Sequence, residues 1–193
     1  MTSLQPLCGA QAEGKWNMHD ISLHLLDLIE NSITAGSTVV DVEIDIDPHA
    51  DSLHIVVDDN GTGLAAHPDE VMNPFYTTKS HKRIGLGLSL LQAVVEQSEG
   101  LMVLDHSPEL GGVRVDVRLC LSHIDRPPIG DLAATVSTMI SAHPDVEFRI
   151  CFRRGHRRVD FNSHRDFRSD DPIAASVEAY KVLHTSFEYS ESL

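Results

Sequence analysis

The sequence predicts an α+β fold in which helices cover one face of an antiparallel or mixed sheet. Apolar side chains recur at helical spacing in residues 19–35 and again in residues 85–97. Four other segments have the pattern of strands, the first by strict alternation of apolar and acidic side chains: residues 38–47, 53–57, 101–106 and 113–121. Short turns indicate antiparallel pairs, so the four strands and two helices should form a two-layer sandwich.

The segment Asp125-Arg126-Pro127-Pro128 marks the end of this sandwich. After it we expect a helix near residues 130–141, a strand pair at 147–153 and 157–161, and a helix from 172 to about 183. Residues 1–17 show no periodicity. We therefore divide the chain into three parts, a flexible leader (1–17), a main domain (18–123) and a small α/β C-terminal extension (124–193).

Composition and charge restrict the partners. The chain has 193 residues, of which 41% are hydrophobic, and its 29 acidic and 15 basic side chains give a net charge of −14. Such a surface repels a phosphate backbone, so nucleic acid is not expected as a partner. Seven arginines nevertheless lie between residues 149 and 168. They indicate either a solvated hairpin or a docking patch.

The cysteines and the apolar segments indicate where the protein works. Cys8, Cys120 and Cys151 are odd in number and far apart, with no metal-ligand spacing around them. Free thiols of this kind fit a reducing compartment. The sequence has no signal-peptide pattern and no apolar run near the ~20 residues that span a bilayer. We expect a cytoplasmic protein that is not bound to a membrane.

A first candidate binding motif is Asp59-Asn60-Gly61-Thr62-Gly63. Its two glycines allow a tight turn and a close approach of the backbone to a ligand. The carboxylate of Asp59 can accept a hydrogen bond from a group such as the adenine amino group. Taken alone, however, Asp-Asn-Gly is also an ordinary turn.

Two further patterns could bind phosphate and a cation. Gly85 and Gly87 stand just before a helix, where free N–H groups attract phosphate oxygens, although a simple packing turn has the same pattern. Asp27 and Asn31 lie one helical turn apart and could hold hydrated Mg²⁺, although a polar stripe facing solvent would look the same. Two histidines on the same helix, His19 and His24, are interpreted as structural or surface residues.

The order of these motifs resembles the Bergerat-fold ATPases, the GHKL superfamily of gyrase, the large heat-shock chaperone, mismatch-repair ATPases and sensor histidine kinases. The resemblance covers residues 19–121. It implies that Asn31 binds magnesium and that Asp59 recognises adenine. It also implies that Gly61 and Gly63 shape the adenine pocket. A mobile lid would contain Thr77, Thr78 and Lys79. A second glycine box at the triphosphate would be formed by Gly85, Gly87 and Leu88.

Two positions depart from the family pattern. Asp27 stands where hydrolysing members carry a Glu that activates water, so its shorter side chain predicts inefficient attack on the γ-phosphate. Val113 stands where the family usually has a Thr near the adenine. An adenine hydrogen bond is therefore expected to be missing.

The resemblance implies an ATP- and Mg²⁺-binding, histidine-kinase-like protein that transfers phosphate to a partner protein. The alternatives are an ATP-dependent switch or assembly factor with little or no kinase activity, and a degenerate domain that binds no nucleotide. The whole chain, including residues 121–131, is also similar to small ATP-binding proteins encoded beside iron-only hydrogenase subunits. A redox-enzyme subunit is thus one expected partner, and the oligomeric state stays open.

Overall fold

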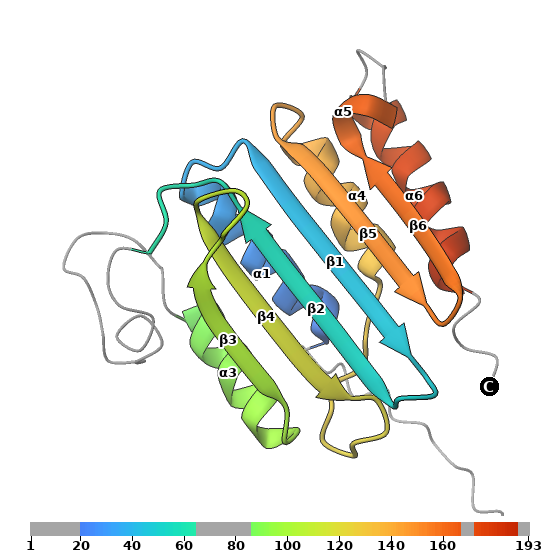
Figure 1. Cartoon of the computed structure of the whole chain (residues 1–193). Coiled ribbons are helices and arrows are strands. Elements are labelled where there is room, and N and C mark those ends of the chain that lie inside the picture. Colours follow the sequence, from blue (N-terminus) through green and yellow to red (C-terminus); the bar gives the residue numbers. More distant parts are fainter. Residues whose placement is uncertain (1–19, 65–85, 167–171, 189–193) are drawn as a thin grey trace, which may run out of the picture.

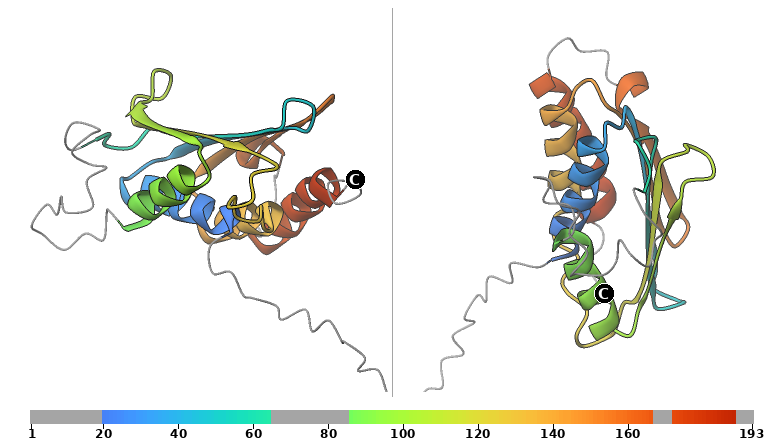
Figure 2. Two further views of the ribbon diagram at one scale, coloured as in Figure 1. Left: turned by 90° about the horizontal axis from the view of Figure 1, so that it is seen from below. Right: turned by 90° about the vertical axis from the view of Figure 1, so that its left-hand side faces the viewer.

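The computed structural model describes residues 20–64, 86–166 and 172–188, which form a six-stranded sheet with helices packed on one of its faces (Figure 1). The two layers are separate when the molecule is turned on its side (Figure 2). The predicted α+β class is therefore confirmed. The strand order across the sheet is β3-β4-β2-β1-β5-β6. The expected leader 1–17 and a short helix expected near residues 69–72 lie outside the described residues.

The first four strands form the predicted antiparallel core. They are β1 (Val39–Asp47), β2 (Ser52–Asp59), β3 (Leu101–His106) and β4 (Val113–Cys120). On β1 the apolar side chains face the helices and are buried, namely Val40, Val42, Ile44 and Ile46. β2 runs two residues beyond its predicted end at Val57. It does so because both carboxylates that follow have partners, Asp58 on the open face of the sheet and Asp59 on the helix face.

Two helices of the main domain cover this part of the sheet, α1 (Ile21–Thr34) and α3 (Leu86–Gln97). Each buries the apolar stripe that its sequence predicted, for example Leu25 and Ile29 on α1 and Leu91 and Val95 on α3. Asp20 is the N-cap of α1 and accepts a hydrogen bond from the N–H of Leu23 at 3.0 Å. The helices and the sheet thus enclose one apolar core.

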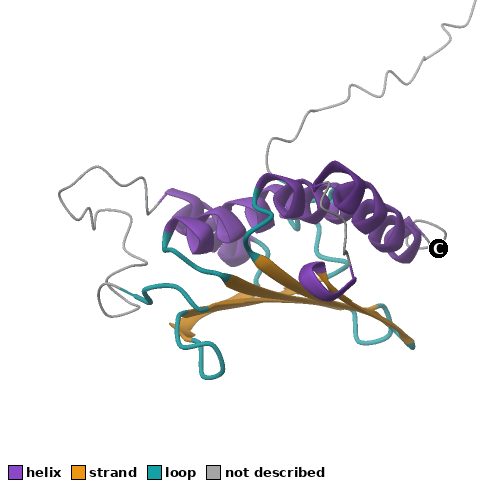
Figure 3. Ribbon diagram, turned by 90° about the horizontal axis from the view of Figure 1, so that it is seen from above, coloured by secondary structure: helices purple, strands orange, loops and turns teal. Residues whose placement is uncertain are grey.

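The C-terminal extension continues the same sheet. β5 (Glu147–Arg154) pairs with β1 in parallel, and β6 (Arg157–Asn162) pairs with β5 in an antiparallel hairpin. The connection to β5 contains α4 (Leu132–Ala142), which packs beside α1. The long helices lie together on one side of the sheet (Figure 3). A short α5 (Ser163–Asp166) and α6 (Pro172–Glu188) follow, and α6 packs on α4. The sequence predicted these elements except α5, and it did not predict that β5 would lie directly beside β1.

The segment before α4 also supports the start of α1. The first N–H groups of a helix have no partner within the helix. Here the N–H groups of Ile21 and Ser22 donate to the carbonyl oxygens of Pro128 and Ile129 at 2.9 and 3.0 Å. The extension therefore completes the N-terminal hydrogen bonds of the helix that carries Asp27 and Asn31.

The second face of the sheet has no helix over it in the described part of the chain (Figure 2). The predicted acidic series of β1 lies on this face, with Glu43 exposed and Asp41, Asp45 and Asp47 half-buried. Within the described ranges, no helix is both long and apolar enough to cross a lipid bilayer.

Candidate functional site

Asp59 lies at the end of β2 and points toward the helix layer. Its side chain is buried, with only 4% of the residue surface exposed. Oδ2 accepts a hydrogen bond from the Ser32 hydroxyl on α1 at 2.7 Å. Oδ1 accepts hydrogen bonds from the N–H groups of Gly61 and Val113, at 2.9 and 3.2 Å. Three segments of the main domain thus fix the orientation of one carboxylate.

The hydrogen-bond capacity of Asp59 is not exhausted by these donors. An ionised carboxylate offers about four lone-pair directions, all of them acceptors. The described residues use three of them, two at Oδ1 and one at Oδ2. Oδ2 can therefore accept one more hydrogen bond, which suits an amino group and disfavours a carbonyl oxygen.

Glycines allow the backbone to come this close to Asp59. A Cβ at Gly112 would overlap both Oδ1 and the carbonyl oxygen of Asp59, and it would lie 2.7 Å from the nitrogen of Gly61. A Cβ at Gly61 would lie 2.6 Å from Ser37 Oγ and 3.0 Å from the carbonyl oxygen of Ala35. Both positions are therefore closed to any side chain, which gives the predicted Gly61 a physical reason.

The remaining residues of this turn are held equally firmly. Asn60 Oδ1 accepts hydrogen bonds from the N–H groups of Thr38 and Val39 at 2.8 and 2.9 Å, so the turn is tied to the start of β1. Gly63 has φ +74°, a backbone conformation that L side chains rarely adopt. The Asp59–Gly63 turn follows β2 and is thus hydrogen-bonded both to the start of β1 and to the β3–β4 connection.

The predicted cation and phosphate residues lie on neighbouring parts of α1 and α3. Asp27 is exposed and Asn31 is half-buried on α1. Gly87, in the first turn of α3, faces Asp27, since a Cβ at Gly87 would lie 3.3 Å from Asp27 Cβ. The backbone of the predicted glycine box therefore adjoins the predicted catalytic carboxylate. Leu88 is 7% exposed and packs in the core, so its side chain has a structural role.

Four predicted site residues lie outside the described residues. These are the lid residues Thr77, Thr78 and Lys79 and the first glycine of the second glycine box, Gly85.

Asp58 lies next to Asp59 in sequence but on the opposite face of the sheet. Its Oδ2 receives a hydrogen bond from Arg114 Nη1 at 2.6 Å. Burial raises the pKa of the Asp58 carboxyl, and the Ser107 hydroxyl and the Arg114 guanidinium act against that increase. The two adjacent carboxylates thus have different partners. Asp58 forms an ion pair with Arg114, and Asp59 accepts hydrogen bonds from neutral donors.

Two residues of this site were not predicted from the sequence, Ser32 and Gly112. Ser32 belongs to the Glu30-Asn31-Ser32 run but received no role, although its hydroxyl contacts Asp59. Gly112 was given no role either, although its lack of a side chain permits the contact between Val113 and Asp59. Neither contact could be derived from spacing, because the partners lie 27 and about 50 residues away in the sequence.

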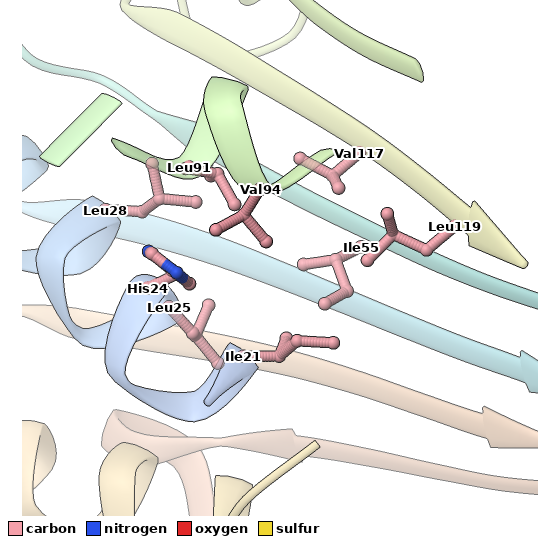
Figure 4. A pocket seen from close by; sticks show the side chains of 9 residues that line it. All are labelled: Ile21, His24, Leu25, Leu28, Ile55, Leu91, Val94, Val117 and Leu119. Atoms are coloured by element: carbon pink, nitrogen blue, oxygen red, sulfur yellow. The ribbon is translucent and has the colours of Figure 1, made fainter. Parts of the chain in front are cut away.

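A small apolar cavity between α1, α3 and the sheet lies apart from these polar groups (Figure 4). Its walls are aliphatic except for the ring of His24, which is 5% exposed. The remaining lining residues are Ile21, Leu25, Leu28, Ile55, Leu91, Val94, Val117 and Leu119. The cavity is part of the core, and the burial of His24 agrees with its interpretation as a structural residue.

Comparisons with known proteins agree with this arrangement. The profile of the family described as histidine kinase-, DNA gyrase B-, and HSP90-like ATPase matches residues 19–123. Sporulation kinase A of Bacillus subtilis is 38% identical over 93 residues, which cover 45% of this chain and 14% of that protein. Sensor histidine kinase CpxA of Escherichia coli is 28% identical over 118 residues, covering 56% of this chain and 25% of that protein.

A solved structure shares the fold. It is the N-terminal domain of a DNA repair protein, with a TM-score of 0.53, 14% sequence identity, and coverage of 83% of this chain and 56% of that chain. The chain spans a quarter or less of the two kinases named above.

Proposed function

The chain belongs to the histidine kinase-, DNA gyrase B- and HSP90-like ATPases, and on this premise we propose that it binds ATP with Mg²⁺ and transfers the γ-phosphate to a partner protein. The observation that carries the nucleotide assignment is the buried carboxylate of Asp59. Three donors fix its direction, and one acceptor position stays available for the adenine amino group. Guanine has a carbonyl oxygen at the equivalent position, and this acceptor would face another acceptor.

Ser32 is proposed to position Asp59 for this contact. Its hydroxyl is a donor to Oδ2 at 2.7 Å and is itself buried. The family usually has a Thr near the adenine where this chain has Val113, whose N–H instead binds Asp59 Oδ1. Ser32, on α1, would thus place a hydroxyl beside the proposed adenine site, on the side opposite Val113.

Asn31 is proposed as the protein ligand of Mg²⁺. Its amide oxygen lies on α1 one turn from Asp27, and the backbone of Gly87 adjoins Asp27. In the described part of the chain no three His, Cys, Asp or Glu side chains form a metal-binding cluster. A single protein oxygen suits Mg²⁺, which keeps water molecules and takes nucleotide phosphates as ligands.

The chemistry of this chain would be positioning and electrostatic stabilisation. ATP, when bound, supplies the phosphoryl group that is transferred. Asn31 would hold the cation that neutralises the phosphates, and the start of α3 at Gly87 would direct backbone N–H groups toward them. Thr77, Thr78 and Lys79 of the lid and Gly85 are proposed to complete the phosphate site.

A second function is favoured by one specific observation. Asp27 stands where hydrolysing members carry a Glu that activates water, and its shorter carboxylate lies next to the first turn of α3, because a Cβ added at Gly87 would be 3.4 Å from Oδ2. Hydrolysis would then be slow, and ATP would act as a switch or assembly signal. In this reading the partner is a protein such as a redox-enzyme subunit, which recognises the ATP-bound state.

The binding proposal is tested by calorimetry with ATP and ADP in the presence of Mg²⁺. Asp59→Asn replaces one acceptor oxygen by a donor, and we expect a loss of affinity of about a hundredfold. Asp58→Asn is the matched control, because it makes the same change on the opposite face of the same strand and should retain binding. Equal losses in both variants, or unchanged binding in Asp59→Asn, would remove the adenine assignment.

Phosphate transfer needs a separate test. The purified chain is incubated with γ-labelled ATP and a cell extract, with Asn31→Ala as the control variant. A labelled protein that depends on Asn31 supports the kinase function. ATP-dependent capture of a protein without labelling supports the switch.

A further inference from the structure

The tip of the β5–β6 hairpin is strongly basic in an acidic protein. Residues 153–158 have the sequence Arg-Arg-Gly-His-Arg-Arg and contain no carboxylate. We call this segment the basic tip. His156, Arg157 and Arg158 are exposed, while Arg153 and Arg154 are half-buried. The basic tip therefore presents positive charge to solvent.

The strand register brings like charges together in the basic tip. Arg153 pairs with Arg158, and Arg154 pairs with Arg157, so the two arginine pairs lie directly opposite one another in the antiparallel ladder. Like charges directly opposite destabilise a strand pair. The Asp160 carboxylate binds Arg158 at 2.8 Å, but both side chains remain about half exposed, at 52% and 55%. The guanidinium group of Arg158 can thus still be reached from solvent.

The basic tip is also the start of an edge strand. β6 pairs with β5, and no strand lies on its other side within the described ranges (Figure 1). An edge strand presents unpaired N–H and C=O groups to an added strand. Arg158 and Asp160 point to the open face of the sheet, while Arg157 and Val159 point to the helix face. An added strand would thus have a guanidinium group beside it on each face.

We propose that β6 binds an extended acidic segment of a partner protein, which adds a strand at this edge and places carboxylates beside Arg157 and Arg158. The backbone would supply the pairing and the arginines the preference for acidic side chains. A nucleic acid fits less well, because it offers no backbone N–H and C=O groups for the edge.

The basic tip lies far from the proposed nucleotide site. The register places Asp59 opposite Val40 and the basic tip opposite Ile46. Six residues of extended strand separate them by about 20 Å. The two proposals can therefore fail independently.

The test uses the full chain and a fluorescein-labelled peptide with consecutive glutamates at its centre and valines on either side, which as a strand presents a carboxylate on each face. Fluorescence anisotropy at low ionic strength should show binding, and Arg157→Gln with Arg158→Gln should weaken it about fivefold. Arg118→Gln is the matched control, because Arg118 is an exposed arginine of β4 on the open face of the same sheet. It should leave binding unchanged, and ATP affinity should stay the same in all variants.

Three comparisons can overturn the proposal. The same peptide with its consecutive central amides N-methylated should lose binding, and equal binding would exclude strand addition. Tighter binding of a single-stranded oligonucleotide or of phosphatidylserine vesicles would assign the tip to another anion. Equal weakening by Arg118→Gln would reduce the effect to net charge.

Discussion

The main domain and the C-terminal extension differ in how their strands are joined to the sheet. In the main domain all three strand pairs are antiparallel, two of them (β1–β2 and β3–β4) are joined by short turns, and glycines bring polar backbone groups against Asp59. In residues 124–188 the first strand, β5, joins in parallel to β1 after a helical crossover. The first region resembles its family, and the second contains two of the largest fully buried side chains, Phe148 and Phe152.

The segment that matches the family is therefore not a separate structural unit of this chain. The family match ends at residue 123, but β1 has neighbours on both edges, one from each region. The start of α1 takes its hydrogen-bond acceptors from Pro128 and Ile129. The proposed nucleotide site therefore depends on a helix and a strand that the extension supports.

Deleting the extension should change folding and ATP binding more than any single substitution. A chain that ends at residue 123 loses β5 and α4, exposes one edge of β1 and leaves the first N–H groups of α1 without their acceptors. We expect no cooperative thermal unfolding and no ATP binding, measured by circular dichroism and calorimetry. A shortened chain that unfolds cooperatively and binds ATP would show that the two regions are independent.

The second prediction concerns the contact of Gly112 with Asp59 within the main domain. Gly112→Ala places a Cβ into Asp59, which should destabilise the fold by about 2–3 kcal/mol and weaken ATP binding. Gly111→Ala is the matched control. Gly111 has φ +85° but nothing within 4 Å of an added Cβ, so only backbone strain of about 1 kcal/mol is expected, without loss of affinity. Urea unfolding and calorimetry distinguish the two, and similar ATP affinities would contradict the packing argument.

The sequence allowed most elements of both regions to be predicted. Alternation along β1 and the apolar stripes of α1 and α3 are local patterns, and local patterns survive into the fold. The strand pair at residues 147–153 and 157–161 was also predicted, and the structure gives β5 and β6 at Glu147–Arg154 and Arg157–Asn162. What could not be predicted is the parallel pairing of β5 with β1, because about 100 residues separate the two strands and no turn fixes their register.

The candidate site shows the same limit on a smaller scale. Asp59 and Gly61 could be selected because residue type and spacing carried the motif. Ser32 and Gly112 could not, since their importance arises only when α1 and the β3–β4 turn meet the end of β2. Long-range packing, which a single sequence does not reveal, thus decides the second set of residues.

The third prediction concerns the effect of Asp58 ionisation on stability as the pH changes. Burial raises the folded-state pKa of Asp58 above the ordinary value of 3.8. The folded state then binds more protons than the unfolded state between these two pKa values, so ionisation of Asp58 lowers stability as pH rises through that window. Asp58→Asn should therefore gain stability relative to wild type from pH 3.8 upward and reach a plateau once the folded pKa is passed. Urea unfolding between pH 4 and pH 7 measures the difference, and a constant offset would contradict this account.

The smallest effect is expected at the contact between His143 and Glu30, which, like the Arg149–Asp41 ion pair, joins the two regions. His143 Nε2 at the end of α4 lies 3.7 Å from Glu30 Oε1 on α1, and the side chains are 29% and 51% exposed. A long, partly solvated pair of this kind contributes less than about 0.5 kcal/mol. A double-mutant cycle with His143→Gln and Glu30→Gln should give a coupling energy below that value, with ATP affinity unchanged. A coupling above about 1 kcal/mol would mean that charge, in addition to apolar packing and the carbonyl groups of Pro128 and Ile129, attaches the extension to the helix of Asn31.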